Sequence, residues 1–237
     1  MRHFGIIGFP LVHSFSAKYF SEKFAREGID AEYSLYPISA DELERISEYV
    51  DRLDGMNVTM PYKQTVIDYL DRLDDTAQAV GAVNVVYKHV GYNTDCLGFM
   101  DSIRPLLRPT DRFALVLGTG GASKAVRYGL QQLGVEPTLV SRTPQEGMLG
   151  YKDLNERLME KYTVIVNSTP LGMHPDIDSC PDIPYECLSA RHLLFDCVYN
   201  PEETLFLRKG KAQGALIRNG MEMLYGQAKA AWAIWNS

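Results

Sequence analysis

A turn made of glycine and small residues lies between a short apolar segment and a helix-forming segment near the middle of this 237-residue chain. Residues 113–117 are predicted to form a buried strand, and the turn Gly118-Thr-Gly-Gly-Ala-Ser-Lys124 leads into a helix expected to reach residue 133. A Gly-x-Gly turn in this context lets the backbone approach a pyrophosphate at a helix N-terminus. Position 123 is Ser rather than Gly, so the match is imperfect, and a purely structural turn stays an alternative.

Alternating strands and helices extend this pattern through both halves of the chain. We expect strands at residues 4–8, 31–36, 56–59, 82–87, 113–117, 138–141, 163–167, 193–196 and 215–217. We expect helices at residues 16–27, 76–80, 95–107, 153–161, 201–209 and 221–235, and one from the turn 118–124 to residue 133. A capping-box pattern at residues 39–42 predicts a further helix that carries Leu43, Ile46 and Val50. Such alternation is typical of α/β proteins, in which helices cover mostly parallel sheets.

Two domains are expected, because a proline-containing segment at residues 104–109 interrupts the alternation. Residues 1–100 with 218–237 are predicted to form a mostly parallel αβα substrate or catalytic domain. Residues 101–217 are predicted to form a Rossmann-like dinucleotide-binding domain. The apolar C-terminal helix is longer than the second half needs, so we expect it to return to the first domain.

Composition excludes several functional classes. The net charge of −6 argues against a nucleic-acid-binding surface, which would be basic. The four cysteines contain no Cys-x-x-Cys pair, so no metal site is expected. Without an export signal these cysteines indicate reduced thiols and a cytoplasmic protein. No run of about 18 apolar residues is present, so no membrane span is expected.

The residues that follow the strand at 138–141 favour NADP over NAD. An NAD-binding protein tends to carry Asp or Glu there, to hold the ribose 2′-hydroxyl. This chain has Ser141, Arg142 and Thr143 instead. A guanidinium and two hydroxyls suit a 2′-phosphate, which a carboxylate would repel. The alternative is that Arg142 is a solvated residue at a strand end.

The first half carries an anion-binding pattern and a possible proton donor. Ser14 and Ser16 follow the first strand, where both hydroxyls could bind one carboxylate, although helix capping is an alternative role. Lys63 follows a proline-started turn, and Asp95 lies downstream as a possible partner. A Lys/Asp pair beside a nicotinamide suits coupled transfer of a hydride and a proton. The alternatives are a surface lysine and a helix-capping aspartate.

Nine segments, in order and at matching spacing, resemble the shikimate dehydrogenase family. They are residues 8–16, 57–63, 81–84, 93–98, 118–122, 141–143, 167–173, 196–201 and 220–227. The resemblance implies a two-domain enzyme with a cleft between its halves. It implies reversible interconversion of 3-dehydroshikimate and shikimate with NADPH or NADP, in the biosynthesis of chorismate and the aromatic amino acids.

The resemblance also assigns roles to individual residues. Lys63 would be the general acid/base, and Asp95 would orient it and bind a ring hydroxyl. The implied substrate ligands are Ser14, Ser16 and Tyr199 for the carboxylate, and Thr59, Asn84 and Gln227 for the hydroxyls. The implied cofactor ligands are Gly118, Thr119, Gly120, Gly121, Ala122, Ser141, Arg142, Thr143, Cys197 and Gly220, of which the last two would lie against the nicotinamide.

The chain departs from the family pattern at several positions. Ala17 replaces a usual proline, and Phe20-Ser21 replaces a usual His-Asn pair. Ser141 replaces a usual asparagine, and the basic residue often found shortly after Arg142 is missing, so the NADP preference could be weaker than the family norm.

Three alternative functions remain open. They are a quinate/shikimate dehydrogenase with relaxed NAD/NADP use, a non-catalytic shikimate-binding homologue and, more remotely, a reductase acting on a folate-type substrate. Retention of both Lys63 and Asp95 argues against the non-catalytic homologue. The family contains monomers and homodimers.

Overall fold

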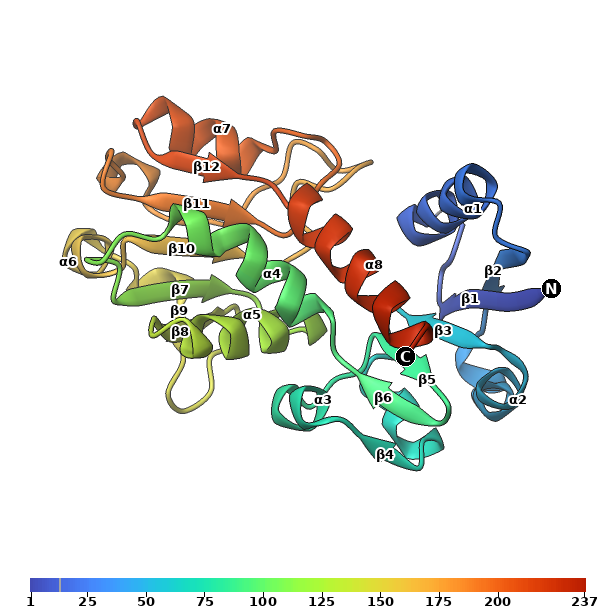
Figure 1. Cartoon of the computed structure of the whole chain (residues 1–237). Helices are drawn as coiled ribbons and strands as arrows, with labels where there is room; N and C mark the ends of the chain where they lie inside the picture. Colours follow the sequence, from blue (N-terminus) through green and yellow to red (C-terminus); the bar gives the residue numbers. More distant parts are fainter. Residues whose placement is uncertain (13) are drawn as a thin grey trace. The chain divides into compact units, whose positions relative to one another are not determined.

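The computed structural model describes residues 1–12 and 14–237, so His13, in the segment 8–16, lies outside the described residues. The chain divides into two compact units, which are coloured along the sequence in Figure 1. Unit 1 comprises residues 1–94 and 227–237, and unit 2 comprises residues 95–226. The divisions thus fall at 94/95 and 226/227, where the sequence suggested 100/101 and 217/218.

Unit 1 is an α/β sheet of mixed direction. Its strands are β1 (Arg2–Gly8), β2 (Ala31–Pro37), β3 (Gly55–Val58), β4 (Arg72–Leu73), β5 (Val85–Tyr87) and β6 (Val90–Tyr92). Its helices are α1 (Phe15–Glu27), α2 (Arg45–Arg52), α3 (Asp75–Val80) and the second part of α8 (Met221–Trp235). The strand order is β2-β1-β3-β5-β6-β4, with β1 parallel to β2 and β3. Strand β5 runs antiparallel to β3 and β6.

The strand predicted at residues 82–87 is shorter in the structure, where β5 covers only Val85–Tyr87 and turns back into β6 as a hairpin. Lys88 and His89 link β5 to β6 with φ values of 48° and 61°. Two-residue hairpin turns of this kind are usually marked by Asn-Gly or Asp-Gly, which have a low cost at positive φ. Lys-His gives no such signal, so β6 was not predicted.

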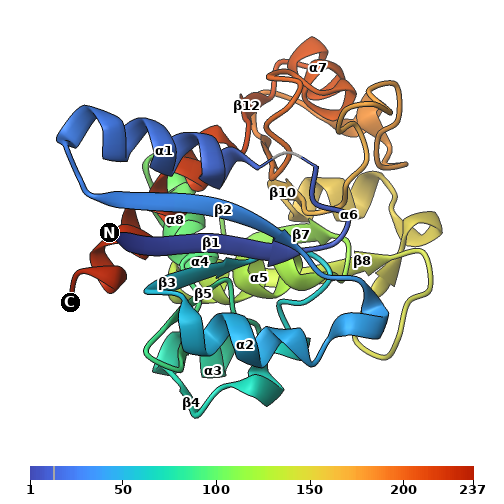
Figure 2. The same cartoon turned by 90° about the vertical axis from the view of Figure 1, so that its right-hand side faces the viewer.

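The alternating side chains of β1 form two cores. Phe4 and Ile6 belong to an aromatic cluster with Phe20 of α1 and Trp235 of α8, and the Trp235 ring stacks on Phe4 with centroids 4.9 Å apart. Ile7 belongs to the core that contains α2. Figure 2 accordingly shows α1 and α2 on opposite faces of β1 and β2. This is the period of two expected for a strand covered on both faces.

Unit 2 is a parallel sheet with helices on both faces. Its strands are β7 (Phe113–Leu117), β8 (Glu136–Ser141), β9 (Leu149–Gly150), β10 (Val164–Asn167), β11 (Leu193–Asp196) and β12 (Leu216–Arg218). Its helices are α4 (Asp95–Ile103), α5 (Gly121–Gln132), α6 (Glu156–Lys161), α7 (Leu205–Ala212) and the first part of α8. The order β12-β11-β10-β7-β8-β9 reverses between β7 and β10, where a doubly wound sheet binds its ligand.

Several predicted helix starts were wrong because capping residues lie further along the chain. Helix α7 begins at Leu205 rather than 201, with Thr204 as its N-cap. Helix α6 begins at Glu156 rather than 153, after Asn155. The capping box at Ser39 opens a 3₁₀ turn, and α2 starts only at Arg45. Thr204 accepts from Leu207 N and Asn155 accepts from Leu158 N, so each satisfies a helix amide that has no partner within the helix, whereas Glu44, the N-cap of α2, makes no such bond.

Candidate functional site

In unit 1, the loops after β1 and β3 are bound to each other. Thr59 N donates to Ile7 O at 2.9 Å, and Phe9 N donates to Met60 O at 3.0 Å. A Cβ added to Gly8 would lie 2.4 Å from Thr59 Cγ2, so only glycine fits there. Strands β2 and β3 lie on opposite sides of β1, so these loops meet at a topological switch point, where ligands of α/β sheets bind.

The twin serines occupy different environments. Ser14 is the N-cap of α1, and its Oγ accepts from Ala17 N at 3.4 Å. This bond uses a lone pair and leaves the hydroxyl hydrogen to donate, so capping and anion binding are compatible. Ser16 is buried, and it opposes the rise in the Tyr33 pKa that burial of that phenol causes. Tyr33 in turn donates to Asn57 Oδ1 at 2.7 Å.

Two of the predicted hydroxyl ligands are brought together. Asn84 Oδ1 accepts from Thr94 N at 2.7 Å, and its Nδ2 donates to Thr94 Oγ1 at 3.0 Å and Gln227 Oε1 at 3.5 Å. Asn84 and Gln227 are 3% and 6% exposed. The Asn84 amide is therefore fixed in orientation before any ligand binds.

Lys63 is held by its backbone beside the same strand. Its carbonyl accepts from Val83 N at 2.7 Å, directly before Asn84 in the chain. The turn that carries it is closed by the bond from Tyr62 N to Thr59 O at 3.0 Å. Thr59, Lys63 and Asn84 therefore come from adjoining segments of unit 1. Asp95 is the first residue of α4 and belongs to unit 2, where it is 8% exposed.

The glycine-rich turn of unit 2 has the geometry that a dinucleotide requires. Gly118 has φ 105°, and its N donates to Val140 O at 2.9 Å. Gly120 is the N-cap of α5, and a Cβ built on it would meet nothing within 4 Å, so its surroundings are open. Ser123, at the imperfect third position, donates its hydroxyl to Gly120 O at 2.6 Å. The open helix N-terminus, followed by Gly121 and Ala122, fits a pyrophosphate.

Two cationic residues follow neighbouring strands beside this turn. Ser141 ends β8, and its Oγ accepts from Thr143 N at 3.2 Å, while Arg142 and Thr143 are exposed. Strand β9 pairs with β8 so that Gly150 lies opposite Ser141, which puts exposed Lys152 at the same edge of the sheet. Sequence reasoning missed Lys152 because β9 has only two residues and gives no periodic signal.

The predicted nicotinamide contacts are Cys197, which follows β11, and Gly220, which lies between β12 and α8. Cys197 N donates to Asn167 O at 2.9 Å. A Cβ on Gly220 would lie 2.3 Å from Cys197 O, so the two residues are in contact and only glycine fits. Tyr199 is half-buried, and burial raises its pKa.

Asp196, to which the sequence assigned no role, is completely buried at this edge. Its carboxylate accepts from the Asn167 side-chain amide at 2.9 Å, from Val198 N at 3.0 Å and from the Thr204 hydroxyl at 2.6 Å. Burial raises the pKa of Asp196 to about 6 in spite of these bonds.

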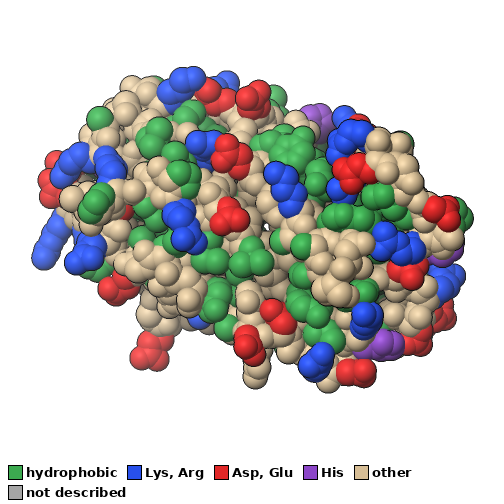
Figure 3. All heavy atoms as spheres, viewed as in Figure 1, with side chains coloured by type: hydrophobic (Ala, Val, Ile, Leu, Met, Phe, Trp, Pro, Cys, Tyr) green, Lys and Arg blue, Asp and Glu red, His purple; other side chains and the backbone are tan. Residues whose placement is uncertain are grey.

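Surface charge, possible metal clusters and helix hydropathy can be described for most of the chain. On the face shown in Figure 3, Lys and Arg side chains lie among Asp and Glu side chains rather than in one patch. Within residues 1–12 and 14–237, no cluster of three or more His, Cys, Asp or Glu side chains could hold a metal ion. In the same residues, no helix is both long enough and apolar enough to cross a membrane.

Comparison with known proteins identifies the family. A family model described as the shikimate dehydrogenase substrate binding domain matches residues 6–86. A shikimate dehydrogenase (NADP(+)) from Clostridium beijerinckii is 37% identical in sequence to this chain. The alignment covers 99% of this chain and 92% of the Clostridium protein. The chain belongs to the shikimate dehydrogenase family. The predicted family is thus confirmed.

Solved shikimate dehydrogenases share the fold. The Aquifex aeolicus enzyme matches with a TM-score of 0.89 at 34% identity, over 100% of this chain and 92% of that one. The Thermus thermophilus enzyme, solved in complex with NADP(H) and shikimate, matches with a TM-score of 0.87 at 29% identity. The match covers 99% of this chain and 93% of that enzyme. The predicted two-domain α/β fold is confirmed, whereas the roles of individual residues remain predictions.

Proposed function

We propose that this chain is an NADP-dependent shikimate dehydrogenase, which reversibly reduces 3-dehydroshikimate to shikimate. The observation that carries the proposal is the match over 99% of the chain to an enzyme whose complex holds NADP(H) and shikimate. The geometry within each unit supports it, because both glycine-dependent loops lie at sheet edges where ligands of α/β proteins bind.

The chemistry requires a hydride at the ketone carbon and a proton at the ketone oxygen. NADPH supplies the hydride when bound. Lys63 donates the proton to the developing alkoxide, which requires its Nζ to be within about 3 Å of that oxygen. Asp95 orients the ammonium group. In the reverse direction Lys63 takes up the proton of the shikimate hydroxyl.

Substrate recognition uses neutral groups, all of which belong to unit 1 except Tyr199. The hydroxyls of Ser14 and Ser16, together with Tyr199, bind the carboxylate through charge-assisted hydrogen bonds. Thr59, Asn84 and Gln227 bind the ring hydroxyls. The bonds that fix the Asn84 amide preorganise this part of the site, because its side chain cannot turn without losing buried partners.

Cofactor recognition belongs to unit 2. The backbone of residues 118–122 and the N-terminus of α5 hold the pyrophosphate. Arg142 binds the 2′-phosphate, with Ser141 and Thr143 beside it, and Lys152 adds a second positive charge from the neighbouring strand. Lys152 thus takes the place of the basic residue missing after Arg142. Cys197 and Gly220 lie against the nicotinamide.

The proposed cellular setting follows from the reaction. Shikimate leads to chorismate and the aromatic amino acids, and we propose that this step takes place in the cytoplasm. The protein acts as a monomer or a homodimer, which analytical ultracentrifugation will distinguish.

The proposal is tested by measuring formation of reduced nicotinamide with purified protein. Shikimate and quinate are each combined with NADP and with NAD. We expect the highest kcat/KM with shikimate and NADP. Preference for quinate or NAD would instead support the dehydrogenase with relaxed specificity. Absence of turnover with every pair, from folded protein that binds shikimate, would support the non-catalytic homologue.

A further inference from the structure

The buried carboxylate of Asp196 connects separate segments at the carboxyl edge of the unit 2 sheet. Asn167, which donates to it, ends β10, and its own Oδ1 accepts from Thr169 N at 3.0 Å and Thr169 Oγ1 at 2.6 Å. Thr204, which also donates to it, is the N-cap of α7. Val198 N donates to it from the loop after β11, and Val198 O accepts from Gly220 N at 3.1 Å.

The three partners of Asp196 are all hydrogen-bond donors, so their bonds favour the ionised form of its carboxylate. An ionised carboxylate accepts all three bonds, whereas a protonated one carries a hydrogen that needs an acceptor. The Oδ2 atom faces the Thr204 hydroxyl, which also accepts from Leu207 N at 3.4 Å. Protonation of Asp196 therefore disturbs the cap of α7 and weakens the attachment of both loops.

The charge of Asp196 is not compensated by a cation in the described part of the chain. Residues 1–12 and 14–237 contain no ion pair to Asp196. The Tyr185 phenol responds to this charge, since its pKa is raised mainly by burial and less by Cys180 and Asp196. Three cations on neighbouring elements are engaged elsewhere: Lys209 lies over the Tyr185 ring, Lys211 pairs with Glu203, and Arg218 of β12 pairs with Glu222.

We propose that Asp196 is a positioning residue for hydride transfer, whose ionised carboxylate holds the loops after β10 and β11 so that Cys197 and Tyr199 face the nicotinamide and the substrate. This inference rests on the proposed function. It assigns to Asp196 a role through its neighbours, because its own side chain is buried and cannot reach either ligand.

The proposal predicts that activity and stability respond to acid in opposite directions. Activity falls as pH is lowered through about 6, because the ionised fraction of Asp196 falls. For stability, the folded-state pKa lies above the ordinary value of 3.8, so between these values the folded state binds more protons than the unfolded state. Protonation of Asp196 therefore favours folding over this range, because relief from burying the charge outweighs the weakened bonds, while the looser loops lower activity.

The test compares Asp196→Asn with the wild type. Asparagine keeps the shape and can still accept from Asn167 and Val198, but it does not titrate. We expect kcat with shikimate and NADP to fall about tenfold through imperfect positioning. We also expect the loss of activity below pH 6 to disappear from the kcat/KM profile, while the NADP affinity changes little.

Asp111→Asn is the matched control, because Asp111 is 4% exposed and lies before β7, at the opposite end of the same sheet. The Asp111→Asn substitution should lower the melting temperature. It should leave unchanged the acid limb of the kcat/KM profile, which is the loss of activity below pH 6. Circular dichroism melts of both variants identify any failure to fold, and Asp196→Glu, which keeps the charge, should retain the acid limb.

An Asp196→Asn variant with the acid limb of the wild type, or with unchanged kcat, would overturn the inference. A wild-type protein inactive on shikimate with NADP would instead refute the proposed function.

Discussion

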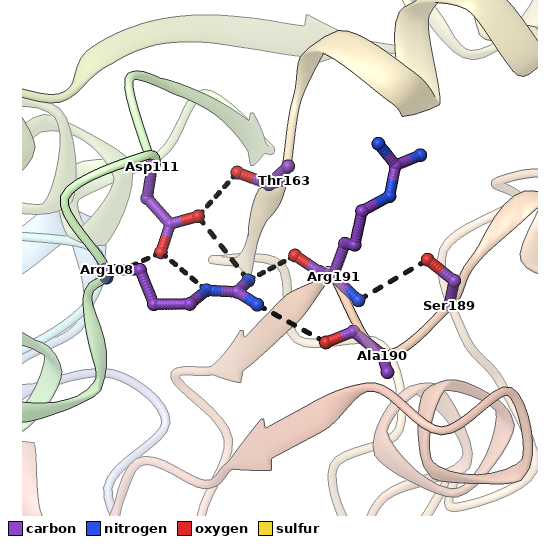
Figure 4. A network of polar contacts seen from close by, with 6 residues as sticks. All are labelled: Arg108, Asp111, Thr163, Ser189, Ala190 and Arg191. Carbon is purple, nitrogen blue, oxygen red and sulfur yellow. Dashed lines mark hydrogen bonds and ion pairs between the residues drawn. The ribbon is translucent and has the colours of Figure 1, made fainter.

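The unit 2 sheet has a buried carboxylate at each end of its strands. Each carboxylate links several segments at its own end, and the two do so in different ways. At the amino end, Asp111 pairs with Arg108, whose Nε lies 3.3 Å from its Oδ2, and Thr163 donates to its Oδ1 at 2.7 Å (Figure 4). Arg108 also donates to Ala190 O at 3.3 Å and to Arg191 O. This network joins the segments that precede β7, β10 and β11.

At the carboxyl end, Asp196 makes the corresponding links with neutral donors alone. A buried charge without a cation is costly, and such groups concentrate at functional sites. The amino end is therefore built for stability, whereas the carboxyl end has a less favourable arrangement next to the proposed cofactor site.

The largest effect is expected for Lys63→Ala, at the carboxyl edge of unit 1. Loss of the proton donor should lower kcat by about 10²- to 10⁴-fold while the KM for shikimate changes much less. Lys88→Ala is the matched control, because Lys88 lies over the Tyr87 ring in the β5–β6 hairpin of the same unit. Equal losses in kcat and affinity, or an effect of Lys88→Ala on turnover, would remove Lys63 from this role.

A smaller effect is expected at the carboxyl edge of unit 2 for Arg142→Asp. Loss of a charge-assisted bond and introduction of a carboxylate should raise the Kd for NADP by about 10- to 100-fold. The Kd for NAD should change little, because NAD has no 2′-phosphate. Titration of the protein with each cofactor measures both values, and equal changes would show that Arg142 does not contact the 2′-phosphate.

At the amino end, Asp111→Ala should affect stability and not chemistry. Removing the carboxylate takes their shared partner from the Thr163 hydroxyl and the Arg108 Nε, although Arg108 keeps its bonds to Ala190 O and Arg191 O. This loss should cost about 1–3 kcal/mol of unfolding free energy. Urea unfolding measures that cost. A change in kcat/KM per folded molecule would contradict the division of roles between the two ends.

The smallest effect is expected for Lys152→Gln. Because Lys152 is exposed, its attraction to a 2′-phosphate is screened, and the Kd for NADP should rise by only about two- to fivefold. The effect should shrink at high salt. Lys161→Gln serves as a control, since Lys161 stacks over the Phe113 ring at the amino end of β7. No change at low salt would remove Lys152 from the cofactor site.

Local sequence patterns were enough to predict most of the helices and strands. The glycine turn predicted the β7–α5 junction, and the predicted helix 221–235 has the bounds of α8. The two-residue strands β4 and β9 were missed, because hydrophobic periodicity needs a longer window.

The buried networks could not be predicted, because their members are distant in the sequence. Asp196 lies 29 residues from Asn167, and Asp111 lies 52 residues from Thr163. Only the parallel register of β7, β10 and β11 brings these side chains together.

The most direct test of the account is a crystal structure of the protein with shikimate and NADP. We predict that the shikimate carboxylate lies against Ser14 and Ser16, the 2′-phosphate lies against Arg142, and Lys63 Nζ lies within about 3 Å of the reacting hydroxyl. Shikimate bound away from Lys63, or a cofactor whose 2′-phosphate lies far from Arg142, would contradict it.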